Sequence, residues 1–473
     1  MLRSSANSYR AKFDSVRASL SRLLQCFTAL LAAIAGAQPA MTTIYTNGPA
    51  TNRLNIVILS EGYTTNQQGQ FLTDATNAAN VLLGWEPFNE YRSHCNVFAI
   101  SVSSAESGSD HPVAASYRNT YFNSSYDPYY DYIITIPPND QDTNYDHGQG
   151  KVDALLQAFM PQCQLPVLLV NDVVWGGSDG FDRTAISYNG ANLYQVLPHE
   201  TGHVLGGLGD EYDAAFVFPD TEEPNTTRET NRAAVKWNAW ISTNTPVPTP
   251  PTAQYANDVG LFQGAHYHPT GWYRPKLDCT MRSFAVSFCE ICRETMVKAF
   301  YQRVRPIDAF SPASANLFLA ATQSQAFSVS LLQPQTHSLS VQWFTNDIAV
   351  ATATNSTFVL PTLPNGSNHV RAIVHDGTDW VKNDSTQSLR QIVSWSVQVG
   401  PQLSLDSAQW LTGGAFAFRV HGVASGPVTV QGSTNLSNWI PLETNTLSGG
   451  EFWHTNAGPT VHPARFFRAV TQP

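Results

Sequence analysis

The chain has 473 residues and a formal net charge of −10 at pH 7, with 42% hydrophobic and 13% charged residues. This composition excludes a disordered chain and provides enough apolar side chains for more than one packed core. The acidic balance, with no Lys/Arg-rich run after the N-terminal region, argues against nucleic-acid binding.

The N-terminus has the pattern of a secretory signal peptide, which we predict over residues 1–38. Five basic residues between Arg3 and Arg22 precede an apolar run over 26–37, and small residues follow it. An uncleaved membrane anchor is the alternative, but the run is shorter than the ~20 residues that cross a bilayer. We therefore expect a secreted protein, extracellular, periplasmic or at the cell surface, without a membrane span once the signal is removed.

Residues 41–305 alternate between strand-like and helical patterns, which predicts an α/β (α+β) domain. The expected strands are Leu54–Leu59, Cys95–Val102, Tyr132–Ile136, Leu165–Asn171 and Thr184–Ser187. The expected helices are Asn66–Leu83, Lys151–Met160, a helix starting near Asn192, and Phe288–Arg303. A Pro/Thr/Asn-rich stretch, Pro219–Ala253, reads as a long loop that forms a cleft wall or lid.

The pattern changes after Pro306, where helical periodicity gives way to short alternating strands and turn signals. Residues 306–398 are predicted to form an immunoglobulin-like β-sandwich with Trp343 in its core, and residues 399–473 a second, small β module. Neither module carries a catalytic motif. We expect them to be spacers, or modules that attach the protein to a cell surface or polysaccharide.

The segment Pro198–Asp213 reads PHETGHVLGGLGDEYD and carries the clearest chemical signal. His199 and His203 are four residues apart, so on a helix their imidazoles share one face and can bind one metal ion. Glu200 lies beside them, where a carboxylate can accept a proton from water. This is the HExxH signature of zinc hydrolases.

Two glycines at 206 and 207 can end the helix and turn the chain, and two acids follow them. Asp210 and Glu211 are both close enough to return as a third ligand. Two histidines and one carboxylate leave zinc a position open for water, as in catalytic sites. The alternative without a metal is a pair of surface histidines on a helix beside a solvated acidic cluster.

The motif HETGHVLGGLGDEY resembles that of the bacterial IgA-peptidase family of zinc metallopeptidases, which is metzincin-like. Five further segments resemble that family in the same order, and together they span about Arg53–Arg303. They are Arg53–Thr64, Glu86–Asp110, Leu168–Gly180, Gly271–Arg282 and Phe288–Glu294. The resemblance implies a metzincin-like zinc peptidase domain that acts on protein or peptide substrates.

The resemblance also implies roles for individual residues. The position of the usual third metzincin ligand is occupied by Gly209 here, and the first acid comes one residue later. This favours Asp210 as the third ligand. Glu211 would then support the ligands from behind, or would be the ligand in place of Asp210. Met281 is the candidate for the methionine turn beneath the metal. Tyr267 and Tyr273 are candidates to contact the substrate oxyanion. Tyr212 is expected to pack beside Asp210.

The strand Thr184–Ser187, just before the zinc helix, is expected from the resemblance to be the sheet edge that pairs with an extended substrate. A plain structural strand is the alternative.

Removal of the signal would leave five cysteines, an odd number for an exported protein. Cys279, Cys289 and Cys292 lie close in sequence, and we expect a disulfide between Cys279 and one of the other two. A second zinc site, with His266 and His268 as further ligands, is the alternative.

Together these features predict a secreted endopeptidase with one catalytic zinc ion, in which Glu200 activates the attacking water. The alternative is a non-catalytic adhesin or carbohydrate-binding protein with a degenerate zincin domain. The presence of Glu200 argues against that alternative, because loss of catalysis would remove the need for a carboxylate there.

Overall fold

The structure is a computed structural model that describes residues 38–139, 142–144, 146–214, 221–284, 286–319, 323–360, 362–400, 402–424, 426–448, 450–456 and 465–471. The signal peptide predicted over 1–38 lies outside the described residues, apart from its last position. Among the described residues, no helix has the length and apolar character needed to cross a membrane.

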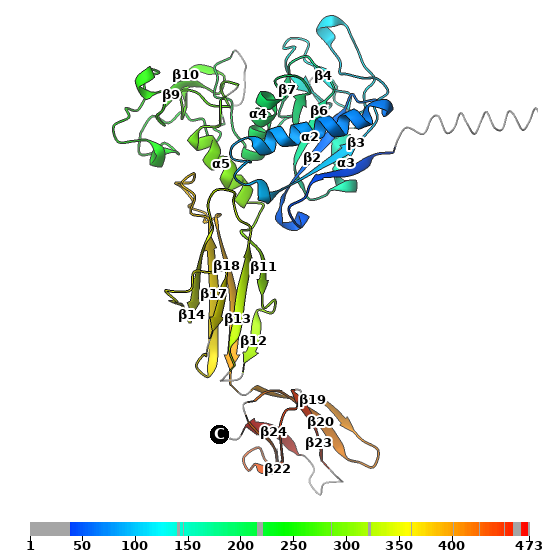
Figure 1. Cartoon of the computed structure of the whole chain (residues 1–473), viewed down its shortest axis with the longest axis vertical. Coiled ribbons are helices and arrows are strands. Elements are labelled where there is room, and N and C mark those ends of the chain that lie inside the picture. Colours follow the sequence, from blue (N-terminus) through cyan, green and yellow to red (C-terminus); the bar gives the residue numbers. More distant parts are fainter. Residues whose placement is uncertain are drawn as a thin grey trace, which may run out of the picture. The chain divides into compact units, whose positions relative to one another are not determined.

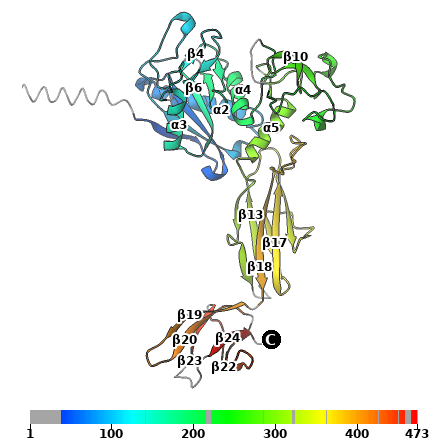
Figure 2. The same ribbon diagram turned by 180° about the vertical axis from the view of Figure 1, so that it is seen from behind.

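The chain folds into two compact units. The first extends through Val304 and also includes Asp379–Asn383, and the second comprises Arg305–Thr378 and the chain from Asp384 onward. Figures 1 and 2 show the helices in the first unit and β-sheets throughout the second.

The first unit is built on a six-stranded sheet in the order β1-β3-β2-β6-β8-β7. The four inner strands are parallel, and the two edge strands run antiparallel to their neighbours. Every residue of β2 is buried, which fits its continuous apolar sequence. The strands are β1 (Ala40–Tyr45), β2 (Leu54–Glu61), β3 (Cys95–Ser101), β6 (Cys163–Val170), β7 (Gly177–Ser178) and β8 (Ala185–Tyr188).

Helices cover both faces of this sheet (Figures 1 and 2). Val57 and Leu59 of β2 pack with Val152 and Leu155 of one helix on the first face. Two other helices pack on the opposite face, as expected from the alternation of side chains along a strand. The first face carries α3 (Gly148–Phe159), and the second carries α2 (Gln68–Gly84) and α4 (Leu193–Gly206).

The helix α4 follows β8 directly and carries both histidines of the HExxH motif. It starts after Asn192, as expected, and continues through Pro198 inside the helix. It ends where Gly207 adopts a left-handed conformation with φ +59°, which a residue with a side chain rarely does. The predicted glycine stop is therefore present, and the chain turns back toward the helix after it.

The rest of the first unit is mostly loop, with a two-stranded sheet and one helix. The sheet pairs β9 (Phe262–Ala265) with β10 (His268–Arg274), neither of which we predicted, and α5 (Glu290–Tyr301) packs against α4. A further short pair is β4 (Ser125–Tyr126) with β5 (Ile134–Thr135). Single 3-10 turns are η1 (Ala50–Asn52), η2 (Thr65–Gln67), η3 (Arg92–His94), η4 (Pro112–Ala114), η5 (Asn238–Trp240) and η6 (Ala253–Tyr255).

The segment Asp379–Asn383 belongs to the first unit although it lies about 75 residues beyond α5 in sequence. The backbone amides of Lys382 and Asn383 donate to the buried carboxylate of Glu294, at 3.2 and 3.3 Å. The guanidinium of Arg293 lies over the Trp380 ring, at 4.6 Å from its centroid. A short stretch of the β-rich region therefore completes the surroundings of α5.

The second unit begins with two facing sheets, β11-β13-β16 and β12-β18-β17-β14-β15. Trp343 is fully buried and stacks on Trp395, with ring centroids 5.9 Å apart, so it occupies the core as predicted. Asn346 and Asp347 both have positive φ and form the turn that their sequence indicates. The strands are β11 (Ile307–Ser311), β12 (Asn316–Leu319), β13 (Gln325–Leu331), β14 (Ser340–Thr345), β15 (Ile348–Ala349), β16 (Thr357–Leu360), β17 (Gly366–His375) and β18 (Arg390–Val399).

Two three-stranded sheets follow, β19-β20-β23 and β22-β21-β24, with a small core of their own around Phe418 and Val430. The strands are β19 (Gln402–Trp410), β20 (Phe416–Val423), β21 (Val428–Ser433), β22 (Ile440–Asn445), β23 (Glu451–Asn456) and β24 (Phe466–Thr471). The first unit is thus mixed α/β and the second all-β.

Candidate metal centre

Three potential ligand atoms form a small triangle at the C-terminal half of α4. His199 Nε2 and His203 Nε2 are 3.2 Å apart, and Asp210 Oδ1 lies 3.1 Å from the first and 3.5 Å from the second. Two ligands on a tetrahedral zinc ion, at about 2.0–2.1 Å from the metal, are separated by about 3.3 Å. The triangle therefore has the dimensions of three vertices of a zinc site.

Both histidines are oriented by hydrogen bonds from their other ring nitrogen. His199 Nδ1 lies 2.9 Å from the carbonyl oxygen of Thr280, and His203 Nδ1 lies 2.6 Å from that of Leu208. A carbonyl can only accept, so each Nδ1 carries a proton, and each Nε2 faces the triangle, where a neutral imidazole can bind a metal ion. This is the usual arrangement of metal-binding histidines.

Asp210 is buried, and its two oxygens differ. Oδ2 accepts hydrogen bonds from the hydroxyls of Tyr212, at 2.9 Å, and of Tyr267. Oδ1 is buried, has no hydrogen-bond partner among the described residues, and faces the two imidazoles. Burial alone would raise the pKa of Asp210, but the positive charge that His203 and His199 carry when no metal is bound outweighs it and lowers that pKa below its usual range. A buried, ionised oxygen without a hydrogen-bond partner, facing two imidazole nitrogens, fits a bound cation.

The two tyrosines are fixed as hydrogen-bond donors. Burial, and then the nearby charge of Asp210, raise the pKa of both Tyr212 and Tyr267 far above the ordinary value. Tyr212 thus packs beside Asp210 as we expected. Tyr267, which we expected at the substrate oxyanion, contacts the Asp210 carboxylate in this structure. Tyr273 lies half-buried in β10.

The loop that carries Asp210 is held by a residue that sequence reasoning missed. The side chain of Asn225 accepts from the Gly209 amide at 2.7 Å, and donates to the Gly209 carbonyl and to Glu211 Oε1 at 2.8 and 2.9 Å. It is fully buried. Asn225 therefore clamps both neighbours of Asp210. Nothing in the surrounding sequence, EPNTTRE, distinguishes it from a loop asparagine.

Glu200 lies next to the triangle. One of its carboxylate oxygens is within 4.8 Å of a ring nitrogen of each histidine, and the residue is buried. Burial raises the pKa of Glu200 to about 7, although the neighbouring imidazoles oppose that rise. A carboxylate with such a pKa can both accept and return a proton near neutral pH.

The edge strand β7 passes beside Glu200. A Cβ atom added at Gly177 would lie 2.9 Å from Glu200 Oε1 and 2.5 Å from a methyl carbon of Val196, so only glycine fits there. The predicted substrate edge, Thr184–Ser187, is placed differently. It corresponds to β8, which lies between β6 and β7 and is not an edge. That expectation was wrong because the two-residue strand β7 has no sequence periodicity by which to detect it.

Met281 lies against α4 between the two histidines. A Cβ atom added at Gly202 would lie 2.8 Å from Met281 Sδ and 3.1 Å from the Phe288 ring. Met281 is fully buried, and its carbonyl oxygen accepts the Glu211 amide at 2.8 Å. It therefore packs under the histidine-bearing turn, where a methionine-turn residue is expected.

Glu211 points away from the histidine pair, toward three cysteines. Its Oε1 accepts from Cys292 Sγ at 3.2 Å. The disulfide predicted for Cys279 is not formed, since all the described cysteines are free and the Cys279 and Cys292 sulfurs are 3.6 Å apart. The predicted alternative partners of a second metal site are elsewhere: the rings of His266 and His268 stack on Trp272.

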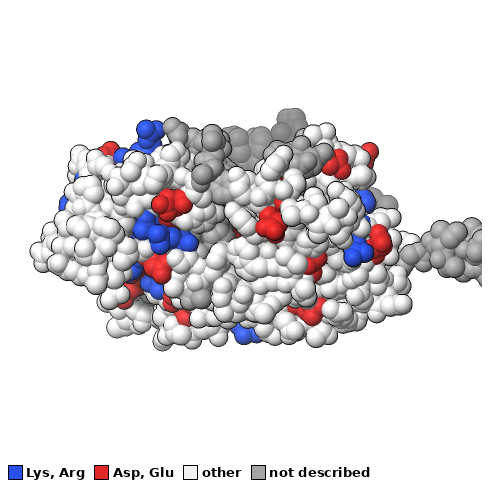
Figure 3. All heavy atoms as spheres, turned by 90° about the horizontal axis from the view of Figure 1, so that it is seen from above, with Lys and Arg blue, Asp and Glu red and all other residues white. Residues whose placement is uncertain are grey.

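The surroundings of the centre carry further acidic groups. Asp182, whose pKa is raised first by burial and then by Asp179, also interacts electrostatically with His203. Elsewhere charge is sparse. The face drawn in Figure 3 is mostly uncharged, with its Lys and Arg side chains in small scattered groups and without a continuous basic surface.

Comparison with known proteins gives one match over the first unit. The model of the family "IgA Peptidase M64" matches residues 42–254 and 251–300. No match was found among curated proteins.

Solved structures resemble the chain only weakly. Fibronectin(III)-like modules of Clostridium thermocellum CbhA are 10% identical, with 32% of this chain and 78% of that chain covered and a TM-score of 0.15. Bacteroides uniformis beta-glucuronidase 3 is 9% identical, with 43% of this chain and 29% of that chain covered and a TM-score of 0.16. The amphioxus IgVJ-C2 molecule is 9% identical, with 32% of this chain and 97% of that chain covered and a TM-score of 0.13. Likenesses at such TM-scores carry no weight for the fold.

The family match spans more than half of the chain and includes every residue of the ligand triangle, Glu200 and Met281. The resemblance inferred from the motif around His199 is thereby confirmed. The chain belongs to the IgA peptidase M64 family of metallopeptidases.

Proposed function

We propose that this protein is a secreted zinc-dependent endopeptidase in which Glu200 activates the attacking water. The observation that carries the proposal is the orphaned Asp210 Oδ1, which faces two imidazole nitrogens across 3.1 and 3.5 Å. Two histidines and one carboxylate are the ligand set of catalytic zinc, which keeps a fourth position open.

The residues present fit a zinc ion, which His199, His203 and Asp210 would hold. When bound, zinc would act as a Lewis acid that lowers the pKa of water and polarises a peptide carbonyl. Neutral Nε2 lone pairs and an ionised carboxylate are the protonation states that metal binding requires. The Thr280 and Leu208 carbonyls hold the proton of each ring on Nδ1, which leaves Nε2 for the metal, and the hydroxyls of Tyr212 and Tyr267 stabilise the ionised carboxylate.

The role of Glu200 follows from its position and its pKa. It would accept a proton from the attacking water and deliver it to the leaving amine, which requires a carboxylate whose pKa is near the working pH. The backbone of β7 lies beside this carboxylate, because Gly177 leaves no side chain between them.

We further propose a metzincin-like arrangement. Its support is the order of parts along the chain: an HExxH helix that ends at Gly207, a carboxylate ligand just after the turn, and Met281 packed beneath the histidines. The N-terminal sequence supports export, and the β-rich second unit is a candidate for attachment to a cell surface or polysaccharide.

If the protein were a non-catalytic adhesin with a degenerate zincin domain, we would expect some ligand or catalytic residues to be missing or separated. The described residues instead bring His199, His203, Asp210 and Glu200 together in one buried cluster.

The test is hydrolysis of an unstructured protein such as casein, together with zinc analysis of the purified chain. Wild type is expected to be active and inhibited by chelators. His203→Ala is expected to lose the zinc bound at this centre. Glu200→Gln is expected to keep zinc and lose about 2–4 decades of turnover.

The matched control is Glu222→Gln, an exposed acid in the loop that follows the metal centre. It should leave both zinc content and turnover unchanged. Near-normal turnover of Glu200→Gln would eliminate the proposed mechanism.

A further inference from the structure

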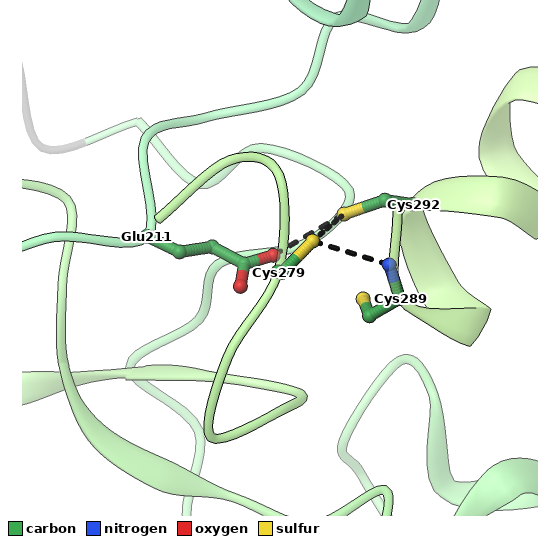
Figure 4. Close-up of side chains that lie close together, drawn as sticks. All are labelled: Glu211, Cys279, Cys289 and Cys292. Atoms are coloured by element: carbon green, nitrogen blue, oxygen red, sulfur yellow. Dashed lines mark hydrogen bonds between the residues drawn. The ribbon is translucent and has the colours of Figure 1, made fainter. Parts of the chain in front are cut away.

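A second cluster of potential metal ligands lies behind the catalytic residues. Glu211, Cys279, Cys289 and Cys292 are all buried, and one ligand atom from each lies within 4.8 Å of the others. Figure 4 shows the Glu211 carboxylate extending toward the sulfurs of Cys279 and Cys292, with Cys289 beside them at the start of α5. We propose that this cluster is a structural zinc site formed by three thiolates and one carboxylate.

The separations between the ligand atoms match such a site. Two thiolates on a tetrahedral zinc ion, with Zn–S near 2.3 Å, lie about 3.8 Å apart, and a thiolate and a carboxylate oxygen about 3.5 Å apart. The Cys279 and Cys292 sulfurs are 3.6 Å apart, and Cys292 Sγ lies 3.2 Å from Glu211 Oε1. A disulfide would bring two sulfurs to about 2.05 Å and leave the third cysteine and the carboxylate without a role.

The polar groups of the cluster are also suited to a cation. Glu211 is fully buried, and its Oε2 has no hydrogen-bond partner among the described residues. The backbone amide of Cys289 points at Cys279 Sγ, across 3.2 Å, which is the type of contact that stabilises a thiolate. A buried carboxylate beside three sulfurs is costly unless a positive ion neutralises it. Sulfur-rich tetrahedral sites select zinc or iron, and the carboxylate favours zinc.

The position of the cluster gives the site a function. Glu211 adjoins the catalytic ligand Asp210, and Cys279 adjoins Thr280, whose carbonyl orients His199. Cys289 and Cys292 lie at the N-terminal end of α5, which packs against α4. One ion would therefore tie both loops of the catalytic centre to one helix, and would fix the third ligand and one histidine in position.

The experiment measures zinc per chain in the full-length protein, purified under reducing conditions, with four variants. The proposal predicts about two zinc ions in wild type, about one in His203→Ala, about one in Cys292→Ser and about none in the double variant. Cys163→Ser, a cysteine outside the cluster, is the control and should keep two. The variants test the cysteine cluster and the histidine centre separately. If the catalytic proposal is wrong, the zinc of the cysteine cluster should still be found.

Cobalt substitution provides a readout that loss of folding cannot imitate. His203→Ala loaded with Co²⁺ should show the sulfur-to-cobalt charge-transfer absorption of a thiolate site, and X-ray absorption of its zinc form should show Zn–S distances near 2.3 Å. One zinc in wild type with none left in His203→Ala would overturn the proposal. A disulfide among Cys279, Cys289 and Cys292, found by mass spectrometry of wild-type protein that has met neither chelator nor reductant, would overturn it as well.

Discussion

The backbone amide of Glu211 donates a hydrogen bond to the carbonyl oxygen of Met281, across 2.8 Å. This bond joins the loop that carries Asp210 to the loop that carries the methionine under the histidines. The same two loops supply the hydrogen-bond acceptors of both histidines, Leu208 and Thr280. The metal centre is thus fixed by two loops that hold each other.

Asp210→Ala is expected to lower zinc affinity more than any substitution of its neighbours, because it removes a ligand atom. Tyr267→Phe and Tyr212→Phe remove only hydrogen bonds to the other oxygen, and each should weaken zinc binding by about 10–100-fold. Competition with a chelator of known affinity measures all three. If Tyr267→Phe keeps wild-type affinity and loses turnover instead, the oxyanion role expected from the sequence is the better assignment.

Glu200→Gln is expected to stabilise the metal-free protein at pH 8 and to leave its stability unchanged at pH 4.5. The folded-state pKa of Glu200 is raised by burial, so the native state loses stability as pH rises from about 4.5 to about 7 and the carboxyl ionises. A shift of that size corresponds to about 3 kcal/mol. Thermal unfolding of chelated wild type and variant across this range measures the difference, and equal pH dependence would show that Glu200 is solvated.

The midpoint at which activity falls on the acidic side should lie above the ordinary pKa of a glutamate. The proposed mechanism requires ionised Glu200, whose pKa burial raises to about 7, whereas a bound divalent cation would lower it again. We therefore expect kcat/KM to fall with a midpoint between about 4.5 and 7 as pH decreases. The profile should be measured where zinc stays bound, since protonation of the histidines would release it. A midpoint below 4 would indicate a solvated carboxylate.

Gly202→Ala is expected to destabilise the protein and weaken zinc binding, although alanine normally favours a helix by about 1 kcal/mol over glycine. The added methyl would lie 2.8 Å from Met281 Sδ and push the floor of the site, which costs about 1–3 kcal/mol. Gly69→Ala in α2 is the matched control, because its methyl meets nothing within 4 Å. In denaturant unfolding, Gly202→Ala should lower the free energy of unfolding and Gly69→Ala should raise it.

A chain that ends near Asp308 is expected to be less stable than one that ends after β18. The shorter chain lacks Asp379–Asn383, so buried Glu294 loses two amide donors and Arg293 loses the Trp380 ring. Hydrogen bonds to a charged group contribute about 1.5–3 kcal/mol each, which predicts a melting temperature lower by roughly 10 °C. Equal melting temperatures would show that the first unit is complete without this segment.

The elements with strong periodicity were predictable from the sequence, and the connecting parts were not. The buried strand β2 and the helix α5 lie within two residues of their predicted bounds, since apolar runs and helical spacing are local signals. The strand β7 was missed because two residues have no period. The strand β10, with Gly271 and a polar outer face, lacks a strand-like alternation.

The candidate site divides in the same way. His199, Glu200 and His203 were recognisable because their spacing is a property of one helix turn. Asn225 and Thr280 act through a side-chain amide and a backbone carbonyl that tertiary folding brings to the centre, and such contacts leave no pattern in the sequence. The direction of Glu211 was not predictable either, because it depends on cysteines that lie about 70–80 residues further along the chain.

The contribution of Asp379–Asn383 to the first unit imposes an order on biosynthesis. The unit that holds the metal centre cannot complete its packing around α5 until the chain has been delivered through Asn383. At ~5–20 residues per second, synthesis of the intervening β-strands delays completion by on the order of ten seconds. During that interval Glu294 lacks its two backbone amide donors, so the β-rich region contributes to the assembly of the first unit as well as forming a unit of its own.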